Sequence, residues 1–239
     1  MTDKLEKLPP RKEIGDVISD VLTNLAEGLT GIAASDRKQW ALSLGCVMQR
    51  TRGGQFLNTL WREWSHYREA GKIKDEYQFS EQAQACLQEM LDFLDNDSPD
   101  EIRFTVMKKV FLVAATEKVS KRDSVLPQQY MRICRGLSSG EILVLSAAFE
   151  ISKTAKPNQG TSPFREWLQN VAAQSGLKHP SLVEIHEEEL LRKHLLVGHN
   201  VHDHNMVWFG DHYRLTEFGY ELCKFINAYE PISETGSQG

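Results

Sequence analysis

The chain has 239 residues, which is enough to bury a hydrophobic core as one large domain or two small ones. Its 41% hydrophobic and 26% charged residues are ordinary for a globular protein and argue against wholesale disorder. No uncharged apolar run approaches the roughly 20 residues that a membrane span needs, and the N-terminus has no apolar stretch of the kind found in secretion signals. We therefore expect a soluble protein with no membrane partner.

The four cysteines, Cys46, Cys86, Cys134 and Cys223, lie far apart in the sequence. No two of them form a C-x-x-C pair, so a zinc ribbon is not indicated. Scattered cysteines are typical of buried, reduced thiols, because a free cysteine packs as a small apolar side chain. We expect a cytoplasmic location.

The formal net charge of −5 is unevenly distributed. Residues 1–136 hold 20 basic and 20 acidic residues, whereas residues 137–239 hold 8 basic and 13 acidic residues. The excess of acid therefore lies entirely in the C-terminal part. This excess works against non-specific attraction to the phosphate backbone of a nucleic acid.

Residues 1–11 are predicted to be a flexible lead-in to a helical domain over residues 12–136. Within this domain, apolar residues recur at the i, i+3, i+4, i+7 spacing of amphipathic helices. This spacing predicts helices over residues 12–29, 35–50, 56–71 and 80–94. Gly53-Gly54 is expected to separate the second helix from the third. The first helix has a thin apolar stripe, which could complete a homodimer as easily as a monomer core.

Serine residues mark the starts of several later helices. Ser98 precedes a proline and has a glutamate three residues after it, whereas Ser138 and Ser181 each begin an S-x-x-E capping box. Ser162 is followed by Pro163 and marks a fourth start, although arginine stands at its third position. Each serine can accept a hydrogen bond from an otherwise unpaired backbone N–H, so we predict that helices begin at these residues.

The C-terminal part, residues 137–229, has the order helix, helix, helix, hairpin, helix. The three helices are predicted over residues 138–152, 163–175 and 182–194. Residues 195–197 and 206–209 are apolar and predict two short strands that form a β-hairpin around a polar loop. A last helix follows Tyr213, and residues 230–239 are expected to form a flexible tail. The predicted fold class is mainly α, with a helical N-terminal part and a C-terminal winged-helix-like module with a short β-hairpin.

Two short runs of sequence carry a resemblance to known families. The run Tyr213-Arg214-Leu215-Thr216-Glu217-Phe218-Gly219-Tyr220-Glu221-Leu222 resembles the y-x-L-T-x-x-G return from wing to closing helix in many bacterial winged-helix proteins. Together with Ile133-Cys134-Arg135-Gly136-Leu137-Ser138 and the helical region before it, the run also resembles small bacterial proteins of the abortive-infection alpha type. The first resemblance implies a winged-helix fold, and the second implies a role in bacterial or phage defence or in regulation. Neither family supplies catalytic residues.

In a winged helix the third helix, here residues 182–194, is the one that reads DNA in the major groove. This helix carries four glutamates and two basic residues, so nearby phosphates would repel it. The two basic residues lie at its C-terminal end, where they suit the helix dipole. We therefore predict that this helix contacts a protein, through Glu184, Glu187 and Glu188.

Basic residues gather in the N-terminal part, where several flank Trp61, Trp64 and Tyr67. Basic groups interleaved with aromatic rings bind nucleic acids by phosphate contact and base stacking. These rings, however, lie on the stripe predicted to face the core, so a solvated basic face is the ordinary alternative. The candidate nucleic-acid-binding residues are Arg50, Arg52, Lys108, Lys109, Lys121 and Arg122. They define one alternative function, a dimeric DNA-binding transcriptional regulator.

A histidine-rich loop lies between the two predicted strands. The candidate metal ligands are His199, His202, His204 and His212, the last of them across the presumed hairpin. Neutral imidazoles in this arrangement can bind zinc or nickel, which gives a second alternative, a metal-responsive sensor. No cysteine pair accompanies them, so a polar wing tip is the ordinary interpretation.

The sequence contains no recognisable catalytic motif. His186-Glu187 begins the metalloprotease pattern H-E-x-x-H, but Leu190 stands in place of the second histidine. The phosphate-binding pattern G-x-x-x-x-G-K-[ST] and the nucleophile pattern G-x-S-x-G are also missing. We expect a protein that is not an enzyme, needs no cofactor, and acts by binding a protein partner or by regulation.

Overall fold

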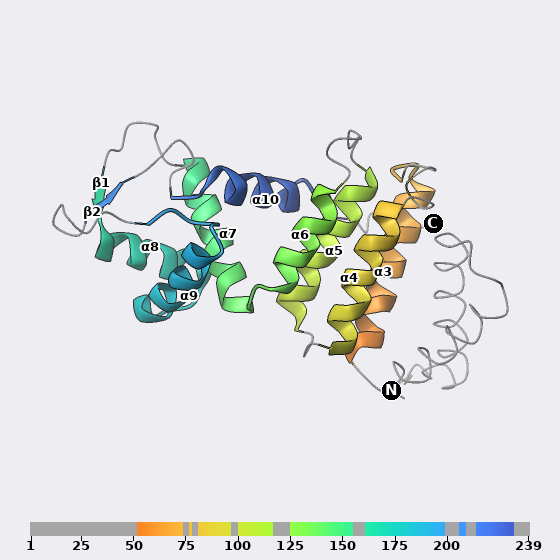
Figure 1. Ribbon diagram of the computed structural model, residues 1–239, viewed down its shortest axis with the longest axis horizontal. Helices are drawn as coiled ribbons and strands as arrows, with labels where there is room; N and C mark the ends of the chain where they lie inside the picture. The colour runs from red at the N-terminus through yellow and green to blue at the C-terminus, as the bar shows by residue number, and fades with distance from the viewer. Residues whose placement is uncertain are drawn as a thin grey trace, which may run out of the picture. The chain divides into compact units, whose positions relative to one another are not determined.

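The structure is a computed structural model and describes residues 52–73, 77, 81–96, 100–116, 125–154, 161–198, 206–208 and 214–231. Most of these residues are helical, which confirms the predicted mainly α fold class (Figure 1). Two compact units divide the chain: one holds the described residues of 52–96 and 114–128, and the other holds those of 100–113 and 129–230. None of the helices in this described part is long and apolar enough to cross a bilayer.

The first unit contains α3 (Arg52–Glu69) and α4 (Glu81–Asn96). Tyr77 lies between the two helices in sequence and joins them. Its ring centroid lies 6.3 Å from that of Trp64 on α3. Burial, and then the nearby Cys86 thiol on α4, raises the pKa of Tyr77. All three side chains are buried, so this contact belongs to the core.

The aromatic stripe on α3 faces the core, as its spacing predicts. Trp64 is 5% exposed and Tyr67 is 4% exposed, so neither ring is available to stack on a base. The prediction of a break at Gly53-Gly54 is wrong, because α3 begins at Arg52 and includes both glycines. Glycine costs a helix only about 1 kcal/mol relative to alanine, which the burial of large side chains farther along α3 outweighs.

The next two helices are α5 (Glu101–Thr116) and α6 (Leu126–Arg135). Asp100 caps α5, since its Oδ1 atom accepts a hydrogen bond from Arg103 N at 3.0 Å. The sequence predicts this cap at Ser98, which lies outside the described residues, and the helix begins two residues later than predicted. Aspartate is as good an N-cap as serine. Asp100 Oδ1 also accepts a hydrogen bond from Ser139 Oγ at 2.7 Å, which links the start of α5 to the start of the next helix.

The capping box at the start of α7 (Ser139–Thr154) is confirmed. Ser138 N donates to Glu141 Oε2 at 2.6 Å, and Glu141 N donates to Ser138 Oγ at 3.3 Å. The second oxygen of this buried carboxylate, Oε1, accepts a hydrogen bond from Lys193 Nζ at 2.7 Å. Glu141 therefore caps α7 and also holds a residue more than fifty positions away.

Two further helices, α8 (Phe164–Ser175) and α9 (Pro180–Arg192), pack against α7 and against each other. All three helices predicted for this part are present, but two of the predicted starts are wrong. α9 begins at Pro180, whose fixed φ suits the first helical position, so Ser181 lies inside the helix and does not cap it. Ser162 and Pro163 belong to a short strand, and α8 begins after them.

A two-stranded antiparallel sheet pairs β1 (Thr161–Pro163) with β2 (Met206–Trp208). β2 falls within a predicted strand, but within the described residues its partner is β1 and not residues 195–197. Leu196 instead makes a single antiparallel bridge with Leu215. The predicted hairpin is therefore not found in the described part, where the segment after α9 pairs with the segment that leads into the last helix.

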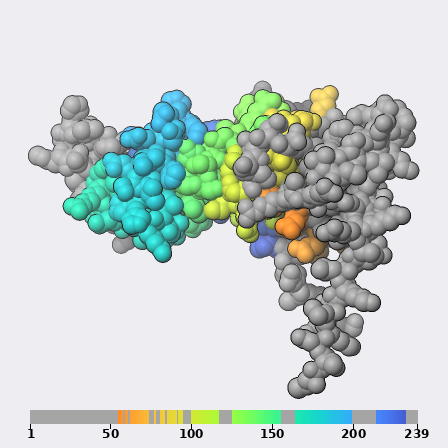
Figure 2. Space-filling model, turned by 90° about the horizontal axis from the view of Figure 1, so that it is seen from below, coloured from red at the N-terminus to blue at the C-terminus, as the bar shows by residue number. Residues whose placement is uncertain are grey.

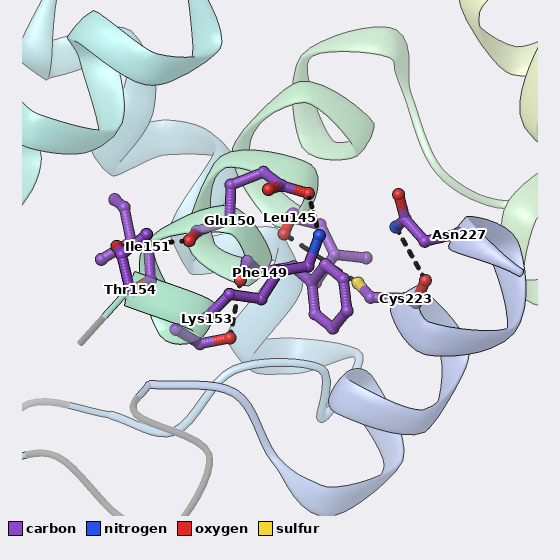
Figure 3. Close-up of polar contacts among 9 residues, drawn as sticks. Leu145, Phe149, Glu150, Ile151, Lys153, Thr154, Cys223 and Asn227 are labelled. Atoms are coloured by element: carbon purple, nitrogen blue, oxygen red, sulfur yellow. Dashed lines mark hydrogen bonds and ion pairs between the residues drawn. The ribbon is translucent and has the colours of Figure 1, made fainter. Parts of the chain in front are cut away.

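The last helix, α10 (Glu217–Asn227), packs against α7. Figure 3 shows this contact: Cys223 Sγ lies 4.0 Å from the carbonyl oxygen of Leu145, and Asn227 Nδ2 donates to the carbonyl of Cys223 at 2.8 Å. The rings of Phe149 and Tyr220 add a tilted aromatic contact, with centroids 5.4 Å apart. α7 is thus in contact with α8, α9 and α10.

The start of α10 depends on Thr216 and Gly219, which belong to the L-T-x-x-G pattern. Gly219 N donates to Thr216 Oγ1 at 2.9 Å, and Thr216 Oγ1 donates to the carbonyl of His194 at 2.8 Å. A Cβ atom on residue 219 would overlap the carbonyl oxygen of Leu195. Glycine is therefore required here by the close approach of two backbones.

We predict that Gly219→Ala lowers the free energy of unfolding by about 1–3 kcal/mol, the usual cost of overpacking. In an unobstructed helix the same change would stabilise by roughly 1 kcal/mol, so the overlap with Leu195 reverses the sign. Gly198→Ala is the matched control, because a Cβ there would meet nothing within 4 Å. Urea unfolding of both variants measures the difference, and a stabilised Gly219→Ala variant would contradict the close approach.

Three of the four cysteines lie in the described residues, and their thiols are buried and free. Burial raises the pKa of Cys86 and the pKa of Cys134 to about 12. Burial also raises the pKa of Cys223 well above its ordinary value. The prediction of buried thiols is confirmed for these three residues, and Cys46 lies outside the described part.

We expect all three buried thiols to be inert in the native Cys46→Ser protein. A thiol reacts as its thiolate, and the raised pKa values leave almost none of that form at pH 8. Mass spectrometry after a maleimide pulse, with and without denaturant, measures the reaction. Modification should follow unfolding, and a fast stoichiometric adduct on native protein would show that at least one thiol is accessible.

Candidate functional site

Helix α9 has one buried face and one exposed face. Val183, Glu187 and Leu190 are buried, at the i, i+4, i+7 spacing of one helical face. The exposed residues of the helix are Ser181, Leu182, Glu184, Ile185, Glu188 and Arg192. We use the name α9 surface for the part of the exposed face formed by Leu182, Glu184, Ile185 and Glu188. Arg192, one turn after Glu188, borders this surface and pairs with Glu189.

The carboxylate of Glu187 lies in the core, with only 2% of the residue exposed. Its Oε1 atom accepts hydrogen bonds from Trp167 Nε1 on α8 at 2.5 Å and from Arg214 Nη1 at 2.8 Å. Burial raises the pKa of Glu187, and the nearby Arg214 charge and the Trp167 hydrogen bond oppose this rise. Burial likewise lowers the pKa of Arg214, and the Glu187 charge opposes that change. Each charge is therefore maintained in the core by the other.

Arg214 has no exposed side-chain surface and contacts two further groups. Its Nε and Nη2 atoms donate to the carbonyl of Val197 at 3.1 and 2.8 Å, and Val197 N donates back to the carbonyl of Arg214 at 2.9 Å. The guanidinium carbon lies 5.2 Å from the ring centroid of Trp167, a cation–π contact. Trp167, Glu187 and Arg214 together join α8, α9 and the segment before α10, and we call them the buried cluster.

The buried cluster corrects one sequence prediction. The sequence places Glu187 on a protein-contacting face with Glu184 and Glu188, but only the latter two are exposed. Residue 187 lies on the apolar face of α9, where a carboxylate is tolerated because Trp167 and Arg214 satisfy it. These partners are 20 and 27 residues away in sequence, so no local pattern reveals them. The spacing from Val183 to Leu190 is the signal that could have placed Glu187 in the core.

Contacts with α7 also fix α9 in place. His186 packs directly on Gly140, where a Cβ atom would overlap its ring. Just after α9, Lys193 forms its ion pair with Glu141. His194 then takes a left-handed conformation with φ of 55°, and Leu195 N donates to the carbonyl of Leu190 at 2.9 Å, which ends the helix. The α9 surface is therefore part of a helix held on several sides.

The α9 surface presents two large apolar side chains to solvent. Ile185 is 57% exposed and Leu182 is 40% exposed. Glu184 and Glu188 lie four residues apart and form one edge beside Ile185, since each residue advances about 100° around a helix. Figure 2 shows atoms of α8 and α9, in teal to light blue, at the surface of the face in view. The α9 surface can therefore make aliphatic contacts through Leu182 and Ile185 next to the negative charges of Glu184 and Glu188.

The described structure gives two of the candidate nucleic-acid-binding lysines another role. Lys108 is only 8% exposed, and the ammonium groups of Lys108 and Lys109 lie 5.8 and 5.6 Å from the ring centroid of Tyr229. A lysine stem packs well on apolar surface while its charge interacts with an aromatic face. Lys108 is therefore largely buried, and the nucleic-acid hypothesis stays a prediction. Arg50, Lys121, Arg122 and the side chain of Arg52 lie outside the described residues.

The four candidate metal ligands, His199, His202, His204 and His212, also lie outside the described residues. In the part of the chain that the structure describes, no three His, Cys, Asp or Glu side chains are grouped so that they could hold a metal ion. The metal hypothesis therefore stays a prediction.

Comparisons with known proteins add nothing to these features. No family model, curated protein or solved structure matches the chain. The buried cluster and the α9 surface are therefore the features from which a function can be inferred. The α9 surface presents carboxylates and aliphatic side chains to solvent, and groups of this kind make contacts in protein interfaces.

We predict that Arg214→Met lowers the free energy of unfolding by about 3–5 kcal/mol, because it leaves Glu187 as a buried charge without its cation. Arg192→Met is the matched control: it removes an arginine from the exposed ion pair with Glu189 and should cost less than about 1 kcal/mol. Urea unfolding measures both values. Equal effects of the two substitutions would contradict the importance of the buried cluster.

Proposed function

We propose that residues 137–229 form a winged-helix-type module that binds another protein through the α9 surface. The element order α7, β1, α8, α9, β2, α10 supports this module. In it, α8 and α9 would be the helix-turn-helix pair, since they are joined by a short turn and packed on α7. The resemblance of residues 213–222 to the winged-helix return supports the same assignment.

The exposure of Leu182 and Ile185 is the observation that carries the binding proposal. Apolar side chains three residues apart on one helical face are the anchors by which a helix binds in a partner's groove. The core of a protein interface is apolar and depleted in charge, and burial of such side chains drives association. Because α9 is already ordered by the buried cluster and by Glu141, little conformational entropy of the helix would be lost on binding.

The charges on α9 favour a protein over duplex DNA. A DNA-reading helix needs arginine or lysine for phosphates and base edges, whereas Glu184 and Glu188 would face the phosphates here. The only basic residue of α9, Arg192, already pairs with Glu189. Isoleucine and leucine can contact a thymine methyl group but offer no hydrogen bond to a base.

The role that follows is non-enzymatic, as a protein-binding or regulatory module. The resemblance to abortive-infection proteins supplies a biological context, bacterial or phage defence. That context is part of the proposal, and the α9 surface supports the binding role independently of it.

Site-specific photo-crosslinking in the native cells tests the proposal. A photoreactive amino acid at position 185 should capture a discrete protein, because Ile185 is the most exposed apolar anchor of the α9 surface. The same group at Gln169, an exposed residue of α8, is the matched control. Adding Glu184→Lys to the 185 protein should weaken the capture if the surface itself makes the contact.

Equal capture at positions 185 and 169, or no capture at 185, would count against a protein-binding α9 surface. Retardation of duplex DNA by the purified chain, with a steep dependence on salt, would instead favour the DNA-binding regulator.

A further inference from the structure

We infer that the partner segment on the α9 surface is a basic amphipathic segment of another protein, with apolar side chains next to lysine or arginine. This inference rests on the proposed function and adds the chemistry of the partner. It comes from the placement of charge around the two apolar anchors.

The acidic edge is the first part of the argument. Glu184 and Glu188 are exposed, lie one turn apart, and border Ile185 on the same side. A partner that covers Ile185 must also approach both carboxylates and strip water from them. This desolvation is unfavourable unless the partner supplies positive charge or hydrogen-bond donors at that edge.

The two cations at the C-terminal end of α9 are paired with other carboxylates. Arg192 is the one basic residue of α9, and it pairs with Glu189. Lys193, directly after the helix, pairs with the buried Glu141. Both cations therefore already have a carboxylate partner. A cation for Glu184 and Glu188 would have to come from the binding partner.

A second copy of this chain does not fit the same requirement. In a symmetric contact through the α9 surface, each copy presents the same residues to the other. Glu184 and Glu188 would then meet leucine, isoleucine or further glutamate, and the neighbouring Arg192 on this face is already paired with Glu189. Like charges placed together at an interface disfavour that partner, so a different protein with basic side chains is the better occupant.

A displayed library of random peptides, panned against the full-length chain, tests this inference. Peptides enriched on the unchanged chain should carry net positive charge and two apolar residues three or four positions apart. The variant with Glu184→Lys and Glu188→Lys should bind these peptides about tenfold more weakly or worse, since two attractive contacts become repulsive.

The matched control carries Glu69→Lys and Glu217→Lys, two exposed positions on other helices. It has the same net charge as the α9 variant, so it should bind the enriched peptides as the unchanged chain does. Thermal unfolding of both variants checks that they remain folded.

Three outcomes would overturn the inference: enriched peptides that are neutral or acidic, an equal loss of binding in both variants, or no enrichment at all. A dimer in sedimentation that Ile185→Lys dissociates would identify a second copy as the occupant and would also overturn it. The crosslinking experiment separates the two proposals. Capture at position 185 without selection of basic peptides would leave protein binding intact and refute only the basic chemistry.

Discussion

The ion pair between Glu187 and Arg214 is the constraint on which the C-terminal unit depends. It lies in the core, where each charge is acceptable only because the other is present, and Trp167 completes the coordination of the carboxylate. Since Glu187 must face these partners, the rotation of α9 about its own axis is fixed. The solvent exposure of Leu182 and Ile185 is a direct geometric result of this buried contact, because they lie on the opposite side of the helix.

A second set of contacts organises the chain where it leaves α9. Carbonyl groups just beyond the end of α9 have no partner within the helix and must be satisfied by other segments. Here the carbonyls of His194 and Leu195 accept hydrogen bonds from Thr216, and that of Val197 accepts them from Arg214. The L-T-x-x-G pattern thus has a physical meaning. Leu215 bridges to Leu196, and Thr216 caps α10 while it binds the carbonyl of His194. Gly219 allows the backbone of α10 to approach the carbonyl of Leu195.

Local patterns in the sequence predict most helices and the Ser138 capping box, because apolar spacing and capping act over a few residues. They fail where distant residues decide the outcome. The strand at residues 161–163 reads as a helix cap until its pairing with residues 206–208 is known. Glu187 reads as a solvent-facing charge until Arg214 and Trp167 are placed beside it. The start of α9 is a different error, in which the fixed φ of Pro180 outweighs a serine cap.

The contrast between the two faces of α9 has an evolutionary consequence. A single replacement within the buried cluster leaves a buried polar group without its hydrogen-bond partner. Trp167, Glu187 and Arg214 are therefore expected to change only together in descendants of this chain. Substitutions at Leu182, Glu184, Ile185 and Glu188 carry little such penalty, because these side chains are exposed. The exposed face of α9 can therefore change in sequence while the fold persists.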